Sequence, residues 1–193
     1  MKVKKIPVYE FKELNDTAKD KVREWHSQIV SGYNWWDYVV EEWVEKLKEK
    51  GINTDIKQVE FSGFASQGDG ASFTGTIDVP KFMLAHGLVG EFLPIYAEAV
   101  SADSNVWAKL VRIDRHYCHS RTVDIESSEM TVDIESSEEI YYLEQNILGM
   151  CREYMNELYK ELQNEWEHRG SDESIIEDCE ANNWMFDASG RVV

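Results

Sequence analysis

The sequence predicts an α+β fold in which helices pack on one face of a largely antiparallel sheet, in a single domain of residues 1–193. Several stretches repeat apolar residues every three or four positions, as amphipathic helices do. Others alternate apolar and polar residues around turns that contain glycine, as antiparallel strands do. With 42% hydrophobic and 12% aromatic residues, a chain of 193 residues can also bury a substantial core.

The chain begins with a predicted strand and a predicted helix. Residues 3–11 alternate around Pro7, which suits an edge strand because proline lacks the N–H donor that a central strand needs. Apolar residues then recur at helical spacing, and Asn15 or Asp16 is placed to cap this helix. The Gly-Tyr-Asn sequence at 32–34 is expected to end it.

A second helix and a hairpin follow. The apolar stripe over residues 36–47 predicts a helix that ends at Gly51, since glycine is favoured just after a helix C-terminus. Over residues 56–79 the pattern becomes β-like on both sides of the polar turn at 66–70. This segment is therefore predicted to form a hairpin.

A short helix, a strand and a repeat occupy the middle of the chain. The sequence predicts the helix over 91–100 and the strand over 106–119. The octapeptide TVDIESSE then occurs twice, at 122–129 and at 131–138. This repeat is much shorter than the unit of a solenoid protein, so we interpret it as a local duplication that lengthens a hairpin or loop.

Two helices and a short strand are predicted at the end of the chain. The long helix over 138–167 is the clearest element, because its apolar residues form one continuous face. A shorter helix, capped by Ser171 or Asp172, runs through Ala181. Residues 184–193 are predicted to form a last short strand around a turn.

The charge balance narrows the possible functions. The chain has 20 Lys and Arg residues against 37 Asp and Glu residues, which gives a formal charge of −17. Proteins that grip nucleic-acid phosphates use Lys and Arg, so direct binding of nucleic acid is not expected. The three cysteines are far apart in the sequence, which argues against a disulfide framework or a zinc site. Neither a signal peptide nor a membrane-spanning run is visible, so a soluble, cytoplasmic protein is expected.

Four stretches, in the same order along the chain, resemble a family of small phage and prophage proteins. They are YEFKELNDTAKDKVREW at 9–25, WWD at 35–37, FSGFASQGDGASF at 61–73 and the tail at 172–191. Members of this family are largely uncharacterised and are sometimes named antitoxins of toxin–antitoxin systems. The resemblance implies a phage accessory protein that acts in the cytoplasm of a host cell, and such proteins often antagonise host machinery.

The loop at residues 66–72 is the most distinctive segment. One hypothesis is a nest of backbone N–H groups that holds an anion, with Trp35 as an exposed platform on which a base could stack. The other is a hairpin turn in which Gly68 and Gly70 adopt positive φ and Asp69 bonds its own backbone. The two hypotheses are compatible. The candidate ligand-binding residues are Ser66, Gln67, Gly68, Asp69, Gly70, Ser72 and Trp35.

The sequence HYCH at 116–119 brings three potential metal ligands together. In a strand His116 and Cys118 would point to one face and His119 to the other, so no metal site is predicted. A hydrolase or transferase that uses these histidines with Asp69 is an alternative, because histidine titrates near neutral pH. No nucleophile stands at a matching spacing, however, so the chain is predicted not to be an enzyme and to need no cofactor.

Acidic residues form the strongest functional pattern. In the long helix a glutamate recurs at every fourth position, which lines carboxylates along one side at steps of about 6 Å. These residues are Glu153, Glu157, Glu161 and Glu165. The duplicated segment adds acids and contains no Lys or Arg; its candidate residues are Asp124, Glu126, Asp133 and Glu135. Such rows attract basic surfaces and speed their association.

These patterns lead to one principal hypothesis and two alternatives. The principal hypothesis is a non-enzymatic inhibitor of the anti-CRISPR or anti-restriction type, which acts as a DNA mimic by filling the basic groove of a host protein that binds nucleic acid. The first alternative is a protein that binds or sequesters a nucleotide at the loop over 66–72. The second is an antitoxin-like protein that binds a toxin. A homodimer is a further alternative, and a dimer contact that buried the acidic row would contradict the principal hypothesis.

Overall fold

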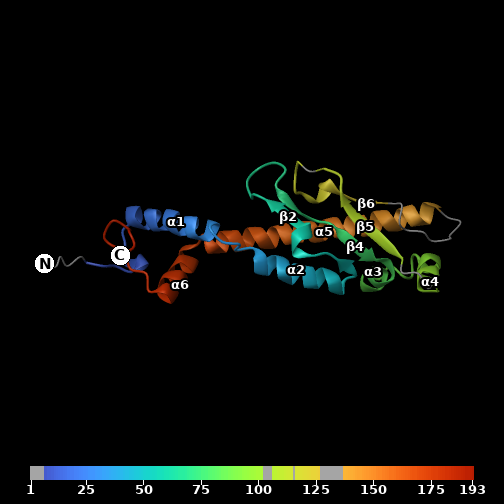
Figure 1. Ribbon diagram of the computed structural model, residues 1–193, viewed down its shortest axis with the longest axis horizontal. Coiled ribbons are helices and arrows are strands. Elements are labelled where there is room, and N and C mark those ends of the chain that lie inside the picture. The colour runs from blue at the N-terminus through green and yellow to red at the C-terminus, as the bar shows by residue number, and fades with distance from the viewer. Residues whose placement is uncertain (1–6, 102–105, 115, 127–136) are drawn as a thin grey trace. The chain divides into compact units, whose positions relative to one another are not determined.

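The computed structural model describes residues 7–101, 106–114, 116–126 and 137–193 (Figure 1). Their contacts define two compact units. The terminal unit joins the residues up to Trp36 to those from Leu162 onward, and the central unit runs from Asp37 to Glu161. The arrangement of residues 1–193 as a single domain stays a prediction.

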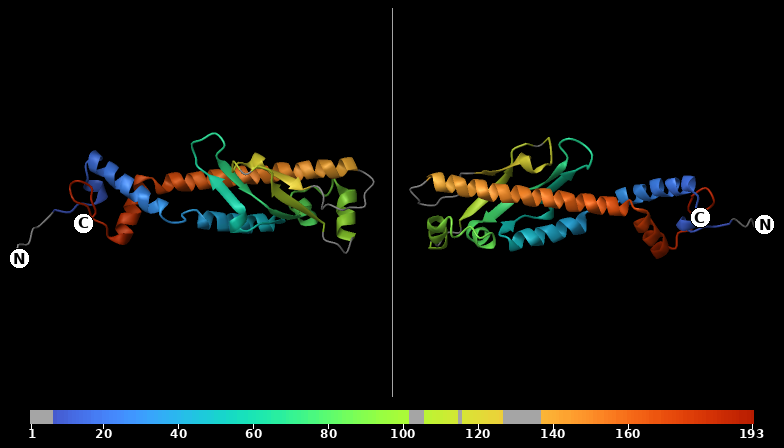
Figure 2. Two further views of the ribbon diagram at one scale, coloured as in Figure 1. Left: turned by 45° about the horizontal axis from the view of Figure 1, so that its top comes forward. Right: turned by 180° about the vertical axis from the view of Figure 1, so that it is seen from behind.

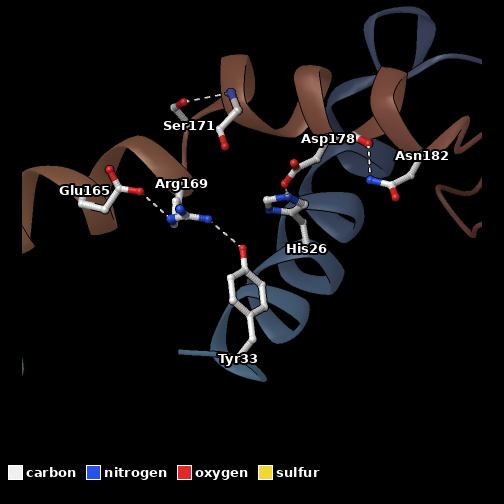
Figure 3. Close-up of polar contacts among 8 residues, drawn as sticks. His26, Tyr33, Glu165, Arg169, Ser171, Asp178 and Asn182 are labelled. Atoms are coloured by element: carbon white, nitrogen blue, oxygen red, sulfur yellow. Dashed lines mark hydrogen bonds and ion pairs between the residues drawn. The ribbon is translucent and has the colours of Figure 1, made fainter. Parts of the chain in front are cut away.

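Two helices of the terminal unit share an apolar core. They are α1 (Asp16–Ser31) and α6 (Asp172–Asn182), and a 3₁₀ helix, η1 (Phe11–Glu13), precedes α1. Asn15 and Ser171 cap the two helices by accepting hydrogen bonds from backbone N–H groups of the first turn, as predicted; Figure 3 shows the Ser171 cap. The buried residues of the core are Phe11, Leu14, Ala18, Val22, Ile175, Cys179 and Phe186.

The predicted strands at the two ends of the chain are reduced to isolated bridges in the described residues. Tyr9 and Phe186 form one antiparallel bridge, and Phe186 forms a second with Val192. The predictions of strands over 3–11 and 184–193 are therefore wrong in their extent. The chain turns into η1 two residues after Tyr9, and a turn at Gly190, with φ of 83°, limits the pairing on the other side.

Among the described residues of the central unit, short strands form two antiparallel sheets. The larger sheet has the order β1 (Ile52–Asn53), β4 (Gly75–Asp78), β5 (Trp107–Arg112) and β6 (Val123–Glu126). The smaller sheet pairs β2 (Val59–Ser62) with β3 (Gly70–Phe73). Arg112 connects the two sheets, because its guanidinium forms an ion pair with Glu60 on β2 and donates to Ser72 Oγ on β3 at 2.7 Å.

The predicted hairpin over residues 56–79 is confirmed only in part. Its first half, from the 3₁₀ helix η2 (Ile56–Gln58) through β2 to β3, follows the prediction. Ile77, however, lies in β4 of the larger sheet. The last residue of the predicted hairpin starts a helix, α3 (Val79–Ala85), because the Asp78 carboxylate accepts a hydrogen bond from an N–H of its first turn.

The predicted strand over 106–119 is too long. Its regular part is β5, which ends at Arg112. The chain then turns at Asp114, whose carboxylate accepts the backbone N–H of His116 at 2.7 Å. It continues into the 3₁₀ helix η3 (Ser120–Thr122) before β6. A turn held by a side chain thus replaces the second half of the expected strand.

Three longer helices confirm those predicted at 36–47, 91–100 and 138–167. They are α2 (Asp37–Glu49), α4 (Leu93–Ser101) and α5 (Ser137–Arg169). The last residues of α5, from Leu162, belong to the terminal unit. Figure 1 and Figure 2 view the central unit from opposite sides and show α5 crossing one face of its strands. The buried α5 residues of this unit include Leu143, Ile147, Cys151, Met155 and Leu158.

The predicted α+β class is confirmed by these helices and antiparallel strands. Within the described ranges, no helix combines the length and the apolar character that crossing a membrane requires. Of the duplicated octapeptide, the first copy supplies β6, and the final two residues of the second copy begin α5. The interpretation of the repeat as a longer hairpin or loop concerns residues 127–136, which lie outside the described residues.

Candidate functional site

Two segments singled out in the sequence meet in the central unit. The loop at 66–72 connects β2 to β3, and residues 116–119 lead into η3. Figure 1 and Figure 2 show these two segments beside each other on the same side of α5. The pattern of either segment alone gave no indication of this contact, because more than forty residues separate them along the chain.

Two glycines allow this close approach. A Cβ atom added at Gly68 would lie 2.5 Å from the Tyr117 ring, and one added at Gly70 would lie 2.6 Å from the Cα atom of His119. Gly68 also has φ of 104°, as the turn hypothesis predicted. Gly70 does not have the predicted positive φ, because it is the first residue of β3 and pairs with β2. Its role is to make room for the neighbouring segment.

The loop is held as a turn by Asp69. Its carboxylate accepts hydrogen bonds from the backbone N–H groups of Ala65 and Ser66, at 3.1 and 2.6 Å, and from the Ser62 hydroxyl at 3.3 Å. These bonds, led by the one from Ser66, lower the pKa of Asp69. Asp69 and the fully buried Ser72 are thus engaged inside the protein, and the side chain of Ser66 is exposed.

A pocket of about 650 Å³ lies at the junction of the two segments and α5. Its lining residues are Gln67, Gly68, Tyr117, His119, Ser120, Arg121 and Asn156. The Tyr117 ring is stacked on His119, with ring centroids 5.7 Å apart and planes 13° from parallel, and Tyr117 is 46% exposed. Nδ1 of His119 is buried and has no hydrogen-bond partner among the described residues. A buried nitrogen in this state is stabilised by any water or ligand that reaches it.

The other polar groups of the pocket are mainly hydrogen-bond donors. The Ser120 hydroxyl donates to Oδ1 of Asn156 at 3.0 Å, so the amide of Asn156 offers its NH₂ group for further contacts. Arg121 is exposed and has no ion-pair partner within the described part of the chain. None of the described lining residues carries a carboxylate. This arrangement is suited to an anion.

Sequence reasoning found only part of this pocket. Gln67, Gly68 and His119 were candidates, whereas Arg121 and Asn156 were not. The only available signal was the position of Arg121, a cation that directly precedes a run of 30 residues without Lys or Arg. Asn156 stands between glutamates on an exposed helix face and gives no signal of its own.

The potential metal ligands at 116–119 do not converge. Among the described residues, no group of three His, Cys, Asp or Glu side chains is placed to hold a metal ion. These residues form a turn and a stacked pair of rings instead of the predicted strand. Cys118 is a free, half-buried thiol.

The predicted row of α5 carboxylates divides into two halves. Glu153 and Glu157 are exposed and have no ion-pair partner among the residues that the structure describes. Glu161 is tied to α2, because it accepts a hydrogen bond from Trp43 Nε1 at 2.5 Å and lies 4.0 Å from Lys46 Nζ. The same ammonium lies 3.7 Å from the centroid of the Trp43 ring, which adds a cation–π contact.

Glu165 is also engaged, within the terminal unit. Its side chain is only 16% exposed and accepts a hydrogen bond from Arg169 Nε at 2.5 Å. The Arg169 guanidinium also donates to the Tyr33 hydroxyl at 2.8 Å, as Figure 3 shows. The glutamates that remain available to a partner on this part of α5 are therefore Glu153 and Glu157.

The acids of the duplicated segment are placed differently from those of α5. Asp124 is half-buried on β6, and its charge, after burial, helps to raise the pKa of Glu144. Glu126 forms an ion pair with Lys109 at 2.8 Å. Asp133 and Glu135 lie outside the described residues.

Trp35 is not the exposed aromatic residue that was expected. It is 5% exposed and packs against Trp36 and Trp166 of the same unit, at centroid distances of 5.6 and 5.4 Å. The prediction was wrong because α2 starts only at Asp37, so Trp35 belongs to the tryptophan cluster of the terminal unit. In the pocket at the loop, the exposed aromatic ring is Tyr117.

Comparison with known proteins identifies a family and no activity. A family model described as a domain of unknown function (DUF8835) matches residues 35–172. No curated protein and no solved structure matches the chain.

Proposed function

The chain belongs to the DUF8835 family, whose domain has no known function, and we propose that it is a non-enzymatic binding protein. In this proposal the exposed carboxylates of α5 occupy a basic groove on a partner that otherwise binds nucleic acid. The resemblance to small phage and prophage proteins supports a host defence protein, such as a CRISPR effector or a restriction complex, as that partner. The protein would act by competition and not by chemistry.

The observation that carries this proposal is the exposed pair Glu153 and Glu157, which we call the acidic α5 surface. The two carboxylates have no ion-pair partner among the described residues and follow each other by one helical turn, about 6 Å along the axis. Two negative charges at this spacing repel each other and destabilise a helix by a few tenths of a kcal/mol. A basic partner would relieve this repulsion.

Neighbouring residues of the acidic α5 surface hold its carboxylates in a position where a partner can bind them. On the next turn Glu161 accepts a hydrogen bond from Trp43 of α2, which fixes this part of α5 against a neighbouring helix. The charges of Glu157 and Glu153 add to burial in raising the pKa of Tyr154. The negative potential of the two carboxylates therefore acts on a neighbouring group, and the net charge of −17 adds to this potential.

The proposal is tested by capture from a host lysate. Wild-type protein and the double variant Glu153→Gln/Glu157→Gln are immobilised and compared at about 50 mM and about 500 mM salt, because screening weakens exposed charge pairs. The wild type should retain a basic nucleic-acid-binding protein at low salt, and duplex DNA should compete with it. The double variant should lose most of this retention.

A matched variant controls for net charge. Glu24→Gln/Glu173→Gln removes two exposed carboxylates from the terminal unit and changes the net charge by the same amount. It should behave as the wild type. Equal retention by Glu153→Gln/Glu157→Gln and wild type would refute the proposal, and capture of a toxin that does not bind nucleic acid would favour the antitoxin-like alternative.

A further inference from the structure

We propose that the pocket between the 66–72 loop, residues 117–121 and α5 binds a nucleoside monophosphate. This site is distinct from the acidic α5 surface and does not depend on the function proposed above. Three features of the pocket support it: its hydrogen-bond donors, its exposed aromatic ring and the close packing that holds the two together.

The donors indicate an anion. Arg121 offers a planar guanidinium, which matches phosphate oxygens well, and has no ion-pair partner among the described residues. Asn156 is oriented by the hydrogen bond that its Oδ1 accepts from Ser120, so its NH₂ group is the part left for a ligand. The exposed side-chain amide of Gln67 offers a further hydrogen-bond donor. No carboxylate among the described lining residues opposes a negative ligand.

The aromatic pair indicates a flat ring on that ligand. Tyr117 is 46% exposed although it is stacked on His119, so part of its ring surface is open to the pocket. Bases stack favourably on exposed tyrosine rings. The buried Nδ1 of His119, which has no partner in the described part of the chain, is a further polar atom beside this ring.

The site is built into the fold. Gly68 lies against Tyr117, and Gly70 lies against His119, at distances that leave no space for a side chain. The ring and the loop are therefore held in a fixed relation, which lowers the entropy lost when a ligand binds. A volume of about 650 Å³ is in the range of small-molecule sites.

Because the whole protein is strongly negative, the affinity of the pocket for an anion depends on the groups that line it. A net charge of −17 repels any anion at long range, so the affinity must come from the donors of the pocket. A single carboxylate introduced among them should therefore weaken binding clearly. Asn156→Asp is the sharpest change, because the new side chain keeps the oxygen that accepts the Ser120 hydrogen bond and adds one negative charge.

The test is calorimetric titration of the full chain with AMP, adenosine and inorganic phosphate. AMP should bind the wild type more tightly than either of the other two probes. Arg121→Gln and Asn156→Asp should each weaken AMP about tenfold, as expected for the loss of a charge-assisted hydrogen bond or the gain of a repulsive charge. Arg121→Gln should leave the binding of adenosine unchanged.

Lys57→Gln is the control, because Lys57 is an exposed cation of the same unit that does not line the pocket. It should bind AMP as the wild type does. The proposal is overturned if AMP does not bind, if inorganic phosphate binds as tightly as AMP, or if neither pocket variant differs from Lys57→Gln. Both substituted residues are exposed, and thermal melting verifies that each variant is folded.

Discussion

Gly190 illustrates how a single position can fix a tight backbone contact. It has φ of 83°, and a Cβ atom there would lie 2.4 Å from the carbonyl oxygen of Ala18 in α1 of the same unit. Both the conformation and the space exclude other residues. The contact holds the C-terminal turn against the start of α1.

We therefore expect Gly190→Ala to lower the free energy of unfolding by about 2 kcal/mol, because the backbone must shift to admit the methyl group. Gly149→Ala is the matched control, since Gly149 lies within α5 and a Cβ there meets nothing within 4 Å. That change should raise stability by up to about 1 kcal/mol. Urea unfolding measures both, and a neutral Gly190→Ala would contradict the account of this turn.

Burial favours the neutral form of His86. Its Nδ1 lies 2.7 Å from the Phe82 carbonyl oxygen, which can only accept, so this nitrogen carries the proton. In the neutral ring Nε2 accepts a hydrogen bond from the Tyr154 hydroxyl at 2.8 Å, which links the end of α3 to α5. Burial, with a smaller effect from the charge of Lys50, lowers the pKa of His86.

This lowered pKa gives a pH dependence with a definite sign. The unfolded chain takes up a proton at His86 near pH 6.5, whereas the folded protein does so only at lower pH, so stability is lost as the pH falls below about 6.5. In urea unfolding between about pH 7.5 and pH 5, His86→Gln should flatten that loss. His168→Gln, at an exposed histidine, should keep the wild-type slope. Identical slopes for both variants would contradict the account.

At the scale of elements, the positions of the long helices could be predicted from the sequence, whereas helix α3 and the strands β1 and β4 were missed. The long apolar faces of α1, α2 and α5 give many repeats of the helical period, so their positions were predicted within a few residues. Strands β1 and β4 have only two and four residues, which is too short for alternation to be recognised. Asp78 is both the last residue of β4 and the N-cap of α3. No turn residues therefore separate the strand from the helix in the sequence, and the change from strand to helix was not recognised.

The candidate pocket was even less predictable, because it exists only through tertiary contact. The loop at 66–72 and residues 116–119 each carried a local signal. Their junction with Asn156 depends on Gly68 and Gly70, whose close contacts a single sequence does not reveal. Conversely, the spacing of the α5 glutamates was visible, whereas the engagement of Glu161 by Trp43 was not.

The caps make a direct test at this scale. Asn15→Ala removes the side-chain oxygen that accepts the Ala18 N–H at 3.0 Å at the start of α1, and should cost about 1 kcal/mol of unfolding free energy. Asn164→Ala, at an exposed position inside α5, should be neutral or slightly stabilising because alanine is the better helix former. Thermal and urea unfolding compare the two. A neutral Asn15→Ala would show that the cap does not stabilise α1.

At the scale of the whole molecule, charge is the dominant property. A net charge of −17 favours basic partners and speeds their approach, but it does not by itself select one face. Ion pairs and hydrogen bonds neutralise several acids locally, among them Glu126, Glu161 and Glu165. The acidic α5 surface is therefore a specific claim about where the remaining charge acts.

The measurement that tests this claim most directly is the salt dependence of affinity for the captured partner. For the wild type, affinity should fall steeply as salt rises, because each exposed charge contact is screened. Glu153→Gln/Glu157→Gln should bind more weakly at low salt and show a clearly shallower dependence, whereas Glu24→Gln/Glu173→Gln should follow the wild type. A dependence that is the same for all three proteins would contradict the proposal that the acidic α5 surface makes the contact.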